Sequence, residues 1–114
     1  MSSLSIEELL KRAGANLETL RLLRIAEETP LADYFAAMKL ANRRAQKSIG
    51  DNMLVSWYDC DRDIESPRRS SESRLDSEIP GYIEFGLKQE ASLVVDVEDG
   101  RFVFFYSKVN SSLR

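Results

Sequence analysis

Acidic and basic side chains concentrate in the segment 59–79, with several serines among them. Loops of this length inside a compact domain are usually either functional or disordered, so the search for chemistry starts here. The acids of the segment are Asp59, Asp61, Asp63, Glu65, Glu72, Asp76 and Glu78, and its arginines are Arg62, Arg68, Arg69 and Arg74.

Four of these acids have the spacing of a calcium-binding loop. Within a twelve-residue window such loops place carboxylates at positions 1, 3, 5 and 12, and here those positions hold Asp61, Asp63, Glu65 and Glu72. Ser66 stands where the sharp turn requires glycine, and Arg69 brings a positive charge to another ligand position. We therefore expect a solvated, mutually paired charge cluster and no metal site.

The basic residues of the segment suggest an anion site. Guanidinium groups of Arg68 and Arg69, with neighbouring serine hydroxyls, supply donors that match a phosphate or a carboxylate. Seven acids against four arginines in the same segment make internal ion pairing the simpler interpretation. Binding of a small anionic ligand remains the more specific alternative.

Two aromatic residues precede the segment. Trp57 and Tyr58 end an expected strand, and successive side chains of a strand point to opposite faces of a sheet. One is expected in the core, and the other can line a pocket with the arginines. The candidate ligand-binding residues are thus Trp57, Tyr58, Asp59, Asp61, Arg68 and Arg69.

Catalysis finds little support. The chain has no histidine, which removes the commonest general base, and its one cysteine, Cys60, lies between two aspartates that disfavour a nucleophilic thiolate. Asp59 or Asp61 with an arginine as electrophile is chemically feasible, but the sequence does not show whether these side chains come together.

We expect a noncatalytic binding or interaction module without a cofactor. The alternative is a small enzyme, or an enzyme subunit, that acts on a small anionic substrate.

Composition indicates one domain over residues 1–114. The chain is 43% hydrophobic and 31% charged, which is typical of a globular protein with a packed core. Its net charge of -3 is interleaved along the sequence, so nucleic acid is not an expected partner. No apolar run approaches the ~18–20 residues that span a bilayer, and the N-terminus does not resemble a secretory signal. With a single cysteine, these features favour the cytoplasm and no membrane partner.

The first half of the sequence contains signals for the start of two helices. Ser5 and Glu8 form a capping box that predicts a helix over roughly 5–13. Residues 18–26 fit a strand with a phase slip about as well as a helix, and the strand is favoured. Thr29 followed by Pro30 predicts the start of a second helix.

The second helix has the clearest periodicity and should end at Gly50. Its apolar residues recur at three- and four-residue steps. Arg43, Arg44 and Lys47 lie toward its C-terminal end, where cations interact favourably with the helix dipole. That structural interpretation is favoured over anion binding.

The second half reads mainly as strands. Residues 53–58 predict a strand, Pro80 predicts a short helix that ends before Ala91, and a strand there is the alternative. Segments 93–97 and 101–106 flank an Asp-Gly turn and predict a hairpin. Residues 109–114 look like a flexible tail.

These elements predict an α+β fold. We expect two layers, with helices packed on a small mixed four-stranded sheet that ends in a β-hairpin. The run 102–105 is apolar on both faces, so its strand should be central or covered twice. Because only the N-terminal helix is left for the second face, we predict that the remaining apolar surface is buried in a homodimer.

Four short runs stand out in the last two thirds of the chain: Leu54-Val55-Ser56-Trp57-Tyr58-Asp59, Glu65-Ser66-Pro67, Pro80-Gly81-Tyr82 and Asp96-Val97-Glu98-Asp99-Gly100-Arg101-Phe102. Together they resemble a small prokaryotic domain family of unknown function. The resemblance covers about residues 17–107 and implies one compact domain, without an activity or site residues to transfer.

Overall fold

A computed structural model describes residues 5–27, 30–67 and 79–109 of the chain. In these residues one mixed sheet has the strand order β1-β4-β5-β2-β3, in which β1 runs parallel to β4 and every other pair is antiparallel. The elements are α1 (Ile6–Arg12), β1 (Arg21–Ile25), α2 (Tyr34–Ile49), β2 (Asn52–Asp59), β3 (Ile64–Ser66), α3 (Gly81–Lys88), β4 (Leu93–Val97) and β5 (Phe102–Lys108).

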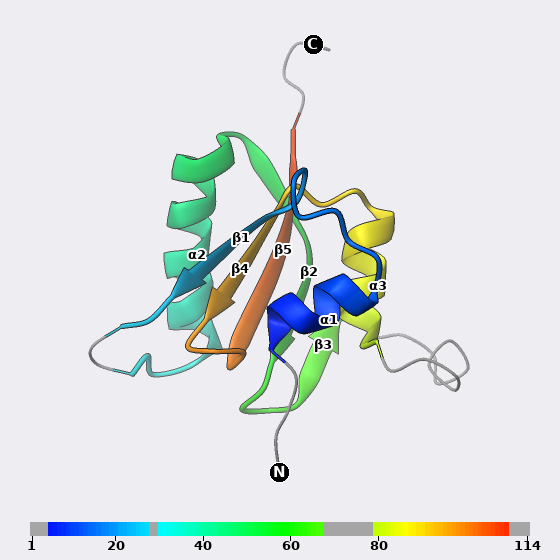
Figure 1. The fold of residues 1–114 in the computed structure, drawn as a ribbon. Helices are drawn as coiled ribbons and strands as arrows, with labels where there is room; N and C mark the ends of the chain where they lie inside the picture. The colour runs from blue at the N-terminus through cyan, green and yellow to red at the C-terminus, as the bar shows by residue number, and fades with distance from the viewer. Residues whose placement is uncertain (1–4, 28–29, 68–78, 110–114) are drawn as a thin grey trace.

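Helices cover both faces of the sheet (Figure 1). On one face the alanines of α2 pack against Val95, Val97 and Phe104, and on the other α1 and α3 pack against Val103 and Phe105. The α+β class is confirmed, but the helices form two layers around the sheet, where one had been expected. The physical reason is that β4 is buried along its whole length, so each of its faces needs a cover.

The strand β5 is central, as its two-sided apolar pattern predicts. Every residue from Phe102 to Tyr106 is buried between the two helical layers. The predicted homodimer rested on an uncovered second face, and α1 and α3 cover that face. The structure therefore removes this reason for self-association, while the oligomeric state itself stays a prediction.

A fifth strand, β3, lies within the segment expected to be a loop. It pairs with the end of β2, where Asp59 stands opposite Ile64. The turn between them includes Asp63 at a φ of 53°. The expectation of four strands was wrong because three residues carry too little periodicity to mark a strand in sequence. The rest of that segment, residues 68–78, lies outside the described residues.

The helix boundaries follow local capping. Ser5 and Glu8 form the predicted capping box of α1. The second helix begins at Tyr34, later than the Thr29-Pro30 signal indicates, because the side chain of Asp33 accepts a hydrogen bond from the amide of Ala36 at 3.0 Å. Gly50 ends α2 at a φ of 75°, as predicted. Residues 21–25 form the favoured strand.

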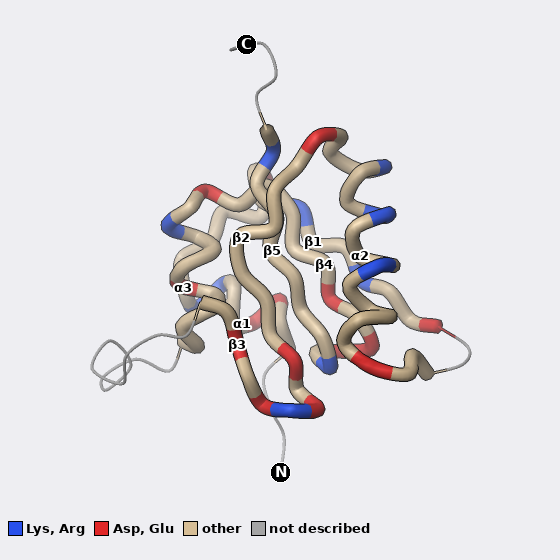
Figure 2. Tube along the Cα trace, turned by 180° about the vertical axis from the view of Figure 1, so that it is seen from behind, with Lys and Arg blue, Asp and Glu red and all other residues tan. Residues whose placement is uncertain are grey.

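The fold separates charges that alternate along the chain. Figure 2 shows Lys and Arg along the outer side of α2, whereas Asp and Glu gather around the β2–β3 turn and the β4–β5 turn. Within the described residues, no helix is both long and apolar enough to cross a membrane.

Candidate functional site

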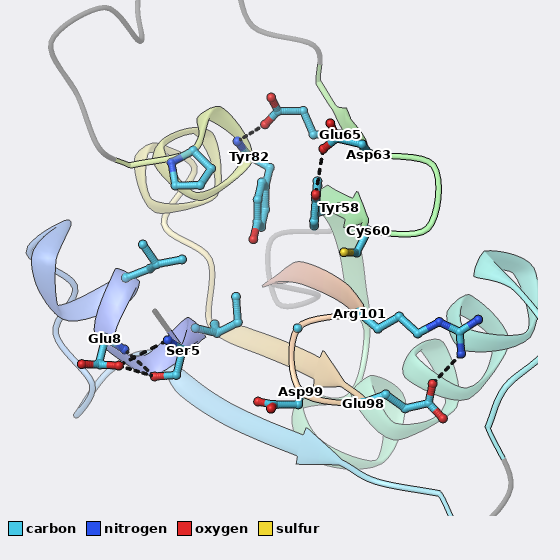
Figure 3. Close-up of a pocket in the computed structure, with 14 residues that line it drawn as sticks. Ser5, Glu8, Tyr58, Cys60, Asp63, Glu65, Tyr82, Glu98, Asp99 and Arg101 are labelled. Atoms are coloured by element: carbon cyan, nitrogen blue, oxygen red, sulfur yellow. Dashed lines mark hydrogen bonds and ion pairs between the residues drawn. The ribbon is translucent and has the colours of Figure 1, made fainter. Parts of the chain in front are cut away.

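A cavity of about 720 Å³ lies where the first turns of α1 and α3 meet the β2–β3 turn and the β4–β5 turn. Four segments that are far apart in sequence contribute to its wall (Figure 3). The lining residues are Ser5, Ile6, Glu8, Leu9, Tyr58, Cys60, Asp63, Glu65, Pro80, Tyr82, Glu98, Asp99, Gly100 and Arg101.

Two stacked tyrosines form one side of the cavity. The rings of Tyr58 and Tyr82 lie 5.1 Å apart at an interplanar angle of 9°. The hydroxyl of Tyr58 donates a hydrogen bond of 2.8 Å to Oδ1 of Asp63. Burial, followed by this hydrogen bond, raises the pKa of Tyr58, and burial likewise raises the pKa of Tyr82. Both phenols therefore stay protonated near neutral pH.

The sheet fixes the position of Tyr82 from two sides. The backbone amide of Tyr82 donates a hydrogen bond of 2.7 Å to Oε1 of Glu65 on β3. The buried hydroxyl of Ser56 on β2 donates a hydrogen bond of 2.8 Å to the Tyr82 carbonyl. These bonds hold the first turn of α3 against the strands that also carry Tyr58.

Arg101 is the one basic residue in the described wall of the cavity. Its guanidinium group binds residues on the side away from the tyrosine pair. Its guanidinium donates to Oδ2 of Asp61 at 2.7 Å, to Oε1 of Glu98 at 2.7 Å and to the carbonyl of Leu31 at 2.9 Å. In Figure 3 it points away from the tyrosine pair. The hydrogen bonds from Arg101 lower the pKa of Asp61 below its ordinary value. Arg101 thus ties the β4–β5 turn to the β2–β3 turn and to the segment before α2.

Carboxylates dominate the rest of the wall. Of the acids that line the cavity, Glu8, Asp63 and Asp99 form no ion pair in the described part of the chain. Asp63 and Asp99 also have left-handed backbones, with φ of 53° and 54°. That conformation is uncommon for residues other than glycine, although aspartate tolerates it better than most. The wall therefore combines aromatic rings with negative charge.

The aromatic pair predicted at the end of β2 divides between the two faces of the sheet, as expected. Tyr58 lines the cavity. Trp57 lies on the opposite face, half-buried, with its ring 4.6 Å from the ring of Tyr34 on α2. Trp57 is thus a packing residue of the α2 face.

The predicted charged residues do not converge on one site. Asp59 is buried and accepts a hydrogen bond of 2.6 Å from Nε of Arg62. Asp61 forms an ion pair with Arg101 and does not itself line the cavity. Arg68 and Arg69 lie outside the described residues, so the anion site that they suggested stays a prediction.

The calcium spacing does not produce a cluster in the described residues. Asp61 binds Arg101, Asp63 accepts from the hydroxyl of Tyr58, and Glu65 accepts from the amide of Tyr82. These carboxylates thus have three separate partners, and the described residues contain no group of three or more potential metal ligands.

The residues that catalysis would need are also separated. Cys60 is exposed at the cavity wall. Asp96 is the described carboxylate whose pKa is raised, chiefly by burial, but it does not line the cavity. Its Oδ1 accepts a hydrogen bond of 2.6 Å from the amide of Gly100 and closes the β4–β5 turn. The buried carboxylate of Asp96 therefore stabilises the β4–β5 turn and lies outside the cavity wall.

Sequence reasoning missed Arg101, Glu98 and Tyr82 as members of a site. Glu98 appeared only as part of a turn, and Tyr82 only as part of a short helix. No local signal marks them, because their contacts are distant in sequence: Arg101 binds Asp61 from 40 positions away, and Tyr82 binds Glu65 from 17 positions away.

Comparison with known proteins places the fold among solved structures. A novel protein from Archeoglobus fulgidus DSM 4304, known from a crystal structure, superposes with a TM-score of 0.65 at 16% sequence identity. The match covers 81% of this chain and 98% of that one, and at this identity it shows a common fold alone. No curated protein matches the sequence.

A family model matches residues 20–106, a range that includes β1 to β4, all but the last two residues of β5, and the cavity wall except Ser5, Ile6, Glu8 and Leu9. The chain belongs to that family, which is described as a domain of unknown function (DUF5619).

Proposed function

We propose that this domain is a noncatalytic binding module whose cavity takes a small organic cation, with an ammonium or guanidinium group on a carbon body. The observation that carries the proposal is the set of carboxylates of Glu8, Asp63 and Asp99, which line the same cavity as the tyrosine pair and have no ion-pair partner in the described residues. The nearby cation, Arg101, is already bound to Asp61 and Glu98.

Simple electrostatics supports this choice of ligand. The carboxylates of Glu8, Asp63 and Asp99 are exposed, so each ion pair with a bound cation contributes about 0.2–1 kcal/mol. The ring of Tyr58 adds about 0.5–2 kcal/mol if the cation lies over its face. The volume of 720 Å³ is within the range of small-molecule sites. The same carboxylates repel an anion, so the described wall of the cavity favours a cation over the anionic ligand that Arg68 and Arg69 suggested.

Two further expectations belong to the proposal. The single cysteine and the archaeal fold relative support a prokaryotic, cytoplasmic setting. Self-association is tested separately, by sedimentation equilibrium over a hundredfold range of concentration. A monomer mass throughout would refute the homodimer and would agree with the cover that α1 and α3 give the second sheet face.

The exposed Cys60 offers a direct assay, because it is the only cysteine of the chain and lines the cavity. The rate at which a maleimide alkylates Cys60 is measured with increasing agmatine or spermidine. A capped tripeptide with a central arginine distinguishes a protein side chain from a free cation as the source of the charge. We expect saturable protection by at least one of these probes and none by citrate at the same ionic strength.

The double variant Asp63→Asn, Asp99→Asn tests the carboxylates while keeping side chains that tolerate a left-handed backbone. It should lower the apparent affinity at least tenfold. The matched control is Glu18→Gln, Asp51→Asn, which removes two exposed charges away from the cavity. Equal protection in both variants, or protection by citrate alone, would refute the proposal.

A further inference from the structure

The helix α2 carries an uncompensated row of positive charge. Its sixteen residues include four cations and no acid. Lys39, Arg43 and Lys47 follow one another at four-residue steps, which is about 6 Å of rise each, and the exposed Phe35 begins the same row. None of these cations forms an ion pair within the described residues.

The helix dipole does not account for the row. Its effect is confined to the last turn, whereas Lys39 is the sixth of the sixteen residues of α2. Like charges at four-residue spacing destabilise an isolated helix, and a merely solvated face commonly alternates signs. Repulsion within the row therefore destabilises α2 when nothing is bound to it, and a polyanionic partner would relieve that repulsion.

We propose that the outer face of α2 binds nucleic acid through its phosphate backbone. Evenly spaced cations suit a repeating phosphate chain, and the exposed Gln46 adds an amide group beside Arg43 and Lys47. A helix about 10–12 Å across also fits the major groove of a duplex, which is about 12 Å wide. The interleaved charge of the whole sequence argued against this partner, but α2 carries four cations and no acid, and Figure 2 shows them along its length.

Nucleic acid is favoured over an anionic membrane because α2 has little apolar surface to insert. A helix that lies in a membrane interface presents a broad apolar face to it. The apolar side of α2, which includes Ala37, Ala41 and Ala45, is already buried against the sheet. Phe35 is the one large apolar side chain of α2 that is exposed, at 61%.

This surface is independent of the cavity. The cavity is lined by α1 and α3, on the opposite face of the sheet from α2 (Figure 1). Failure of the cation proposal would therefore leave this one intact, and the reverse is also true.

The test is fluorescence anisotropy of the full chain with a labelled 20-nucleotide single strand and the matching duplex, over a series of salt concentrations. The triple variant Lys39→Gln, Arg43→Gln, Lys47→Gln should bind at least tenfold more weakly at low salt. The slope of log affinity against log salt should fall by about 2–3, since each phosphate contact contributes about 0.7–0.9.

The matched control is Lys11→Gln, Lys88→Gln, Lys108→Gln, which removes three exposed cations outside α2 and reaches the same net charge. It should keep both the affinity and the slope. Circular dichroism confirms that each variant is folded. The proposal is overturned if the wild type binds neither probe at 50 mM salt, or if the control loses as much affinity as the triple variant. It is equally overturned if phosphatidylserine vesicles bind, or polyglutamate competes, as well as nucleic acid does.

Discussion

Glu65 caps a helix that lies 17 positions away in the sequence: its Oε1 accepts a hydrogen bond of 2.7 Å from the backbone amide of Tyr82. Pro80, at the N-cap position of α3, has no side chain that can do this. The short edge strand β3 therefore stabilises the first turn of α3 and, with it, the tyrosine pair.

Replacing Glu65 with alanine should lower the free energy of unfolding by about 0.5–2 kcal/mol, the usual cost of a lost helix cap. Glu65→Gln keeps an acceptor oxygen and should lose less. Urea denaturation of the three proteins measures the difference. If the alanine variant were as stable as the wild type, the cap would have no energetic role.

Gly86 lies where α3 packs against β5, and a Cβ atom there would fall 2.8 Å from Cγ of Phe105. Alanine would gain up to ~1 kcal/mol in helix propensity but lose ~1–3 kcal/mol to overpacking. Thermal or urea unfolding of Gly86→Ala should therefore show a net loss of stability of up to ~2 kcal/mol. Adding Phe105→Leu should make room for the new Cβ atom, so the double variant should lose less stability than the sum of the two single losses. A loss equal to that sum would contradict this packing.

Asp96 should make stability depend on pH. Burial raises its pKa in the folded protein, so the fold favours the protonated carboxyl. This contribution is fully present below the ordinary value of 3.8 and is lost as the pH rises through the folded pKa. Asp96→Asn keeps an oxygen for the amide of Gly100 and should be more stable than the wild type at pH 7. The advantage should shrink as the pH falls toward 4, whereas a constant difference in urea unfolding at both pH values would contradict the prediction.

The anion site predicted from Arg68 and Arg69 can be tested apart from the cavity. If it exists, phosphate or sulfate should raise the melting temperature of the wild type, because a ligand that binds the folded state stabilises it. Replacing both arginines with alanine should abolish the rise. A wild type that shows no rise across a panel of anions would end this hypothesis.

Local interactions could be predicted from the sequence because neighbouring residues make them. The capping box of Ser5 and Glu8 and the end of α2 at Gly50 have the predicted geometry. The hairpin turn before Arg101 also forms, with Asp99 and Gly100 at positive φ. The two-sided apolar run that begins at Phe102 correctly indicated a central strand.

Tertiary structure alone decided which distant segments meet. Strand β3 exists because it pairs with the end of β2, and three residues have no periodicity of their own to predict it. The tyrosine pair joins positions 58 and 82, and Arg101 reaches Asp61 across 40 positions. These contacts follow from the strand order and from helices on both faces of the sheet. The strand order and the placement of the helices depend on the packing of the whole core, whereas capping and turn signals act over only a few residues.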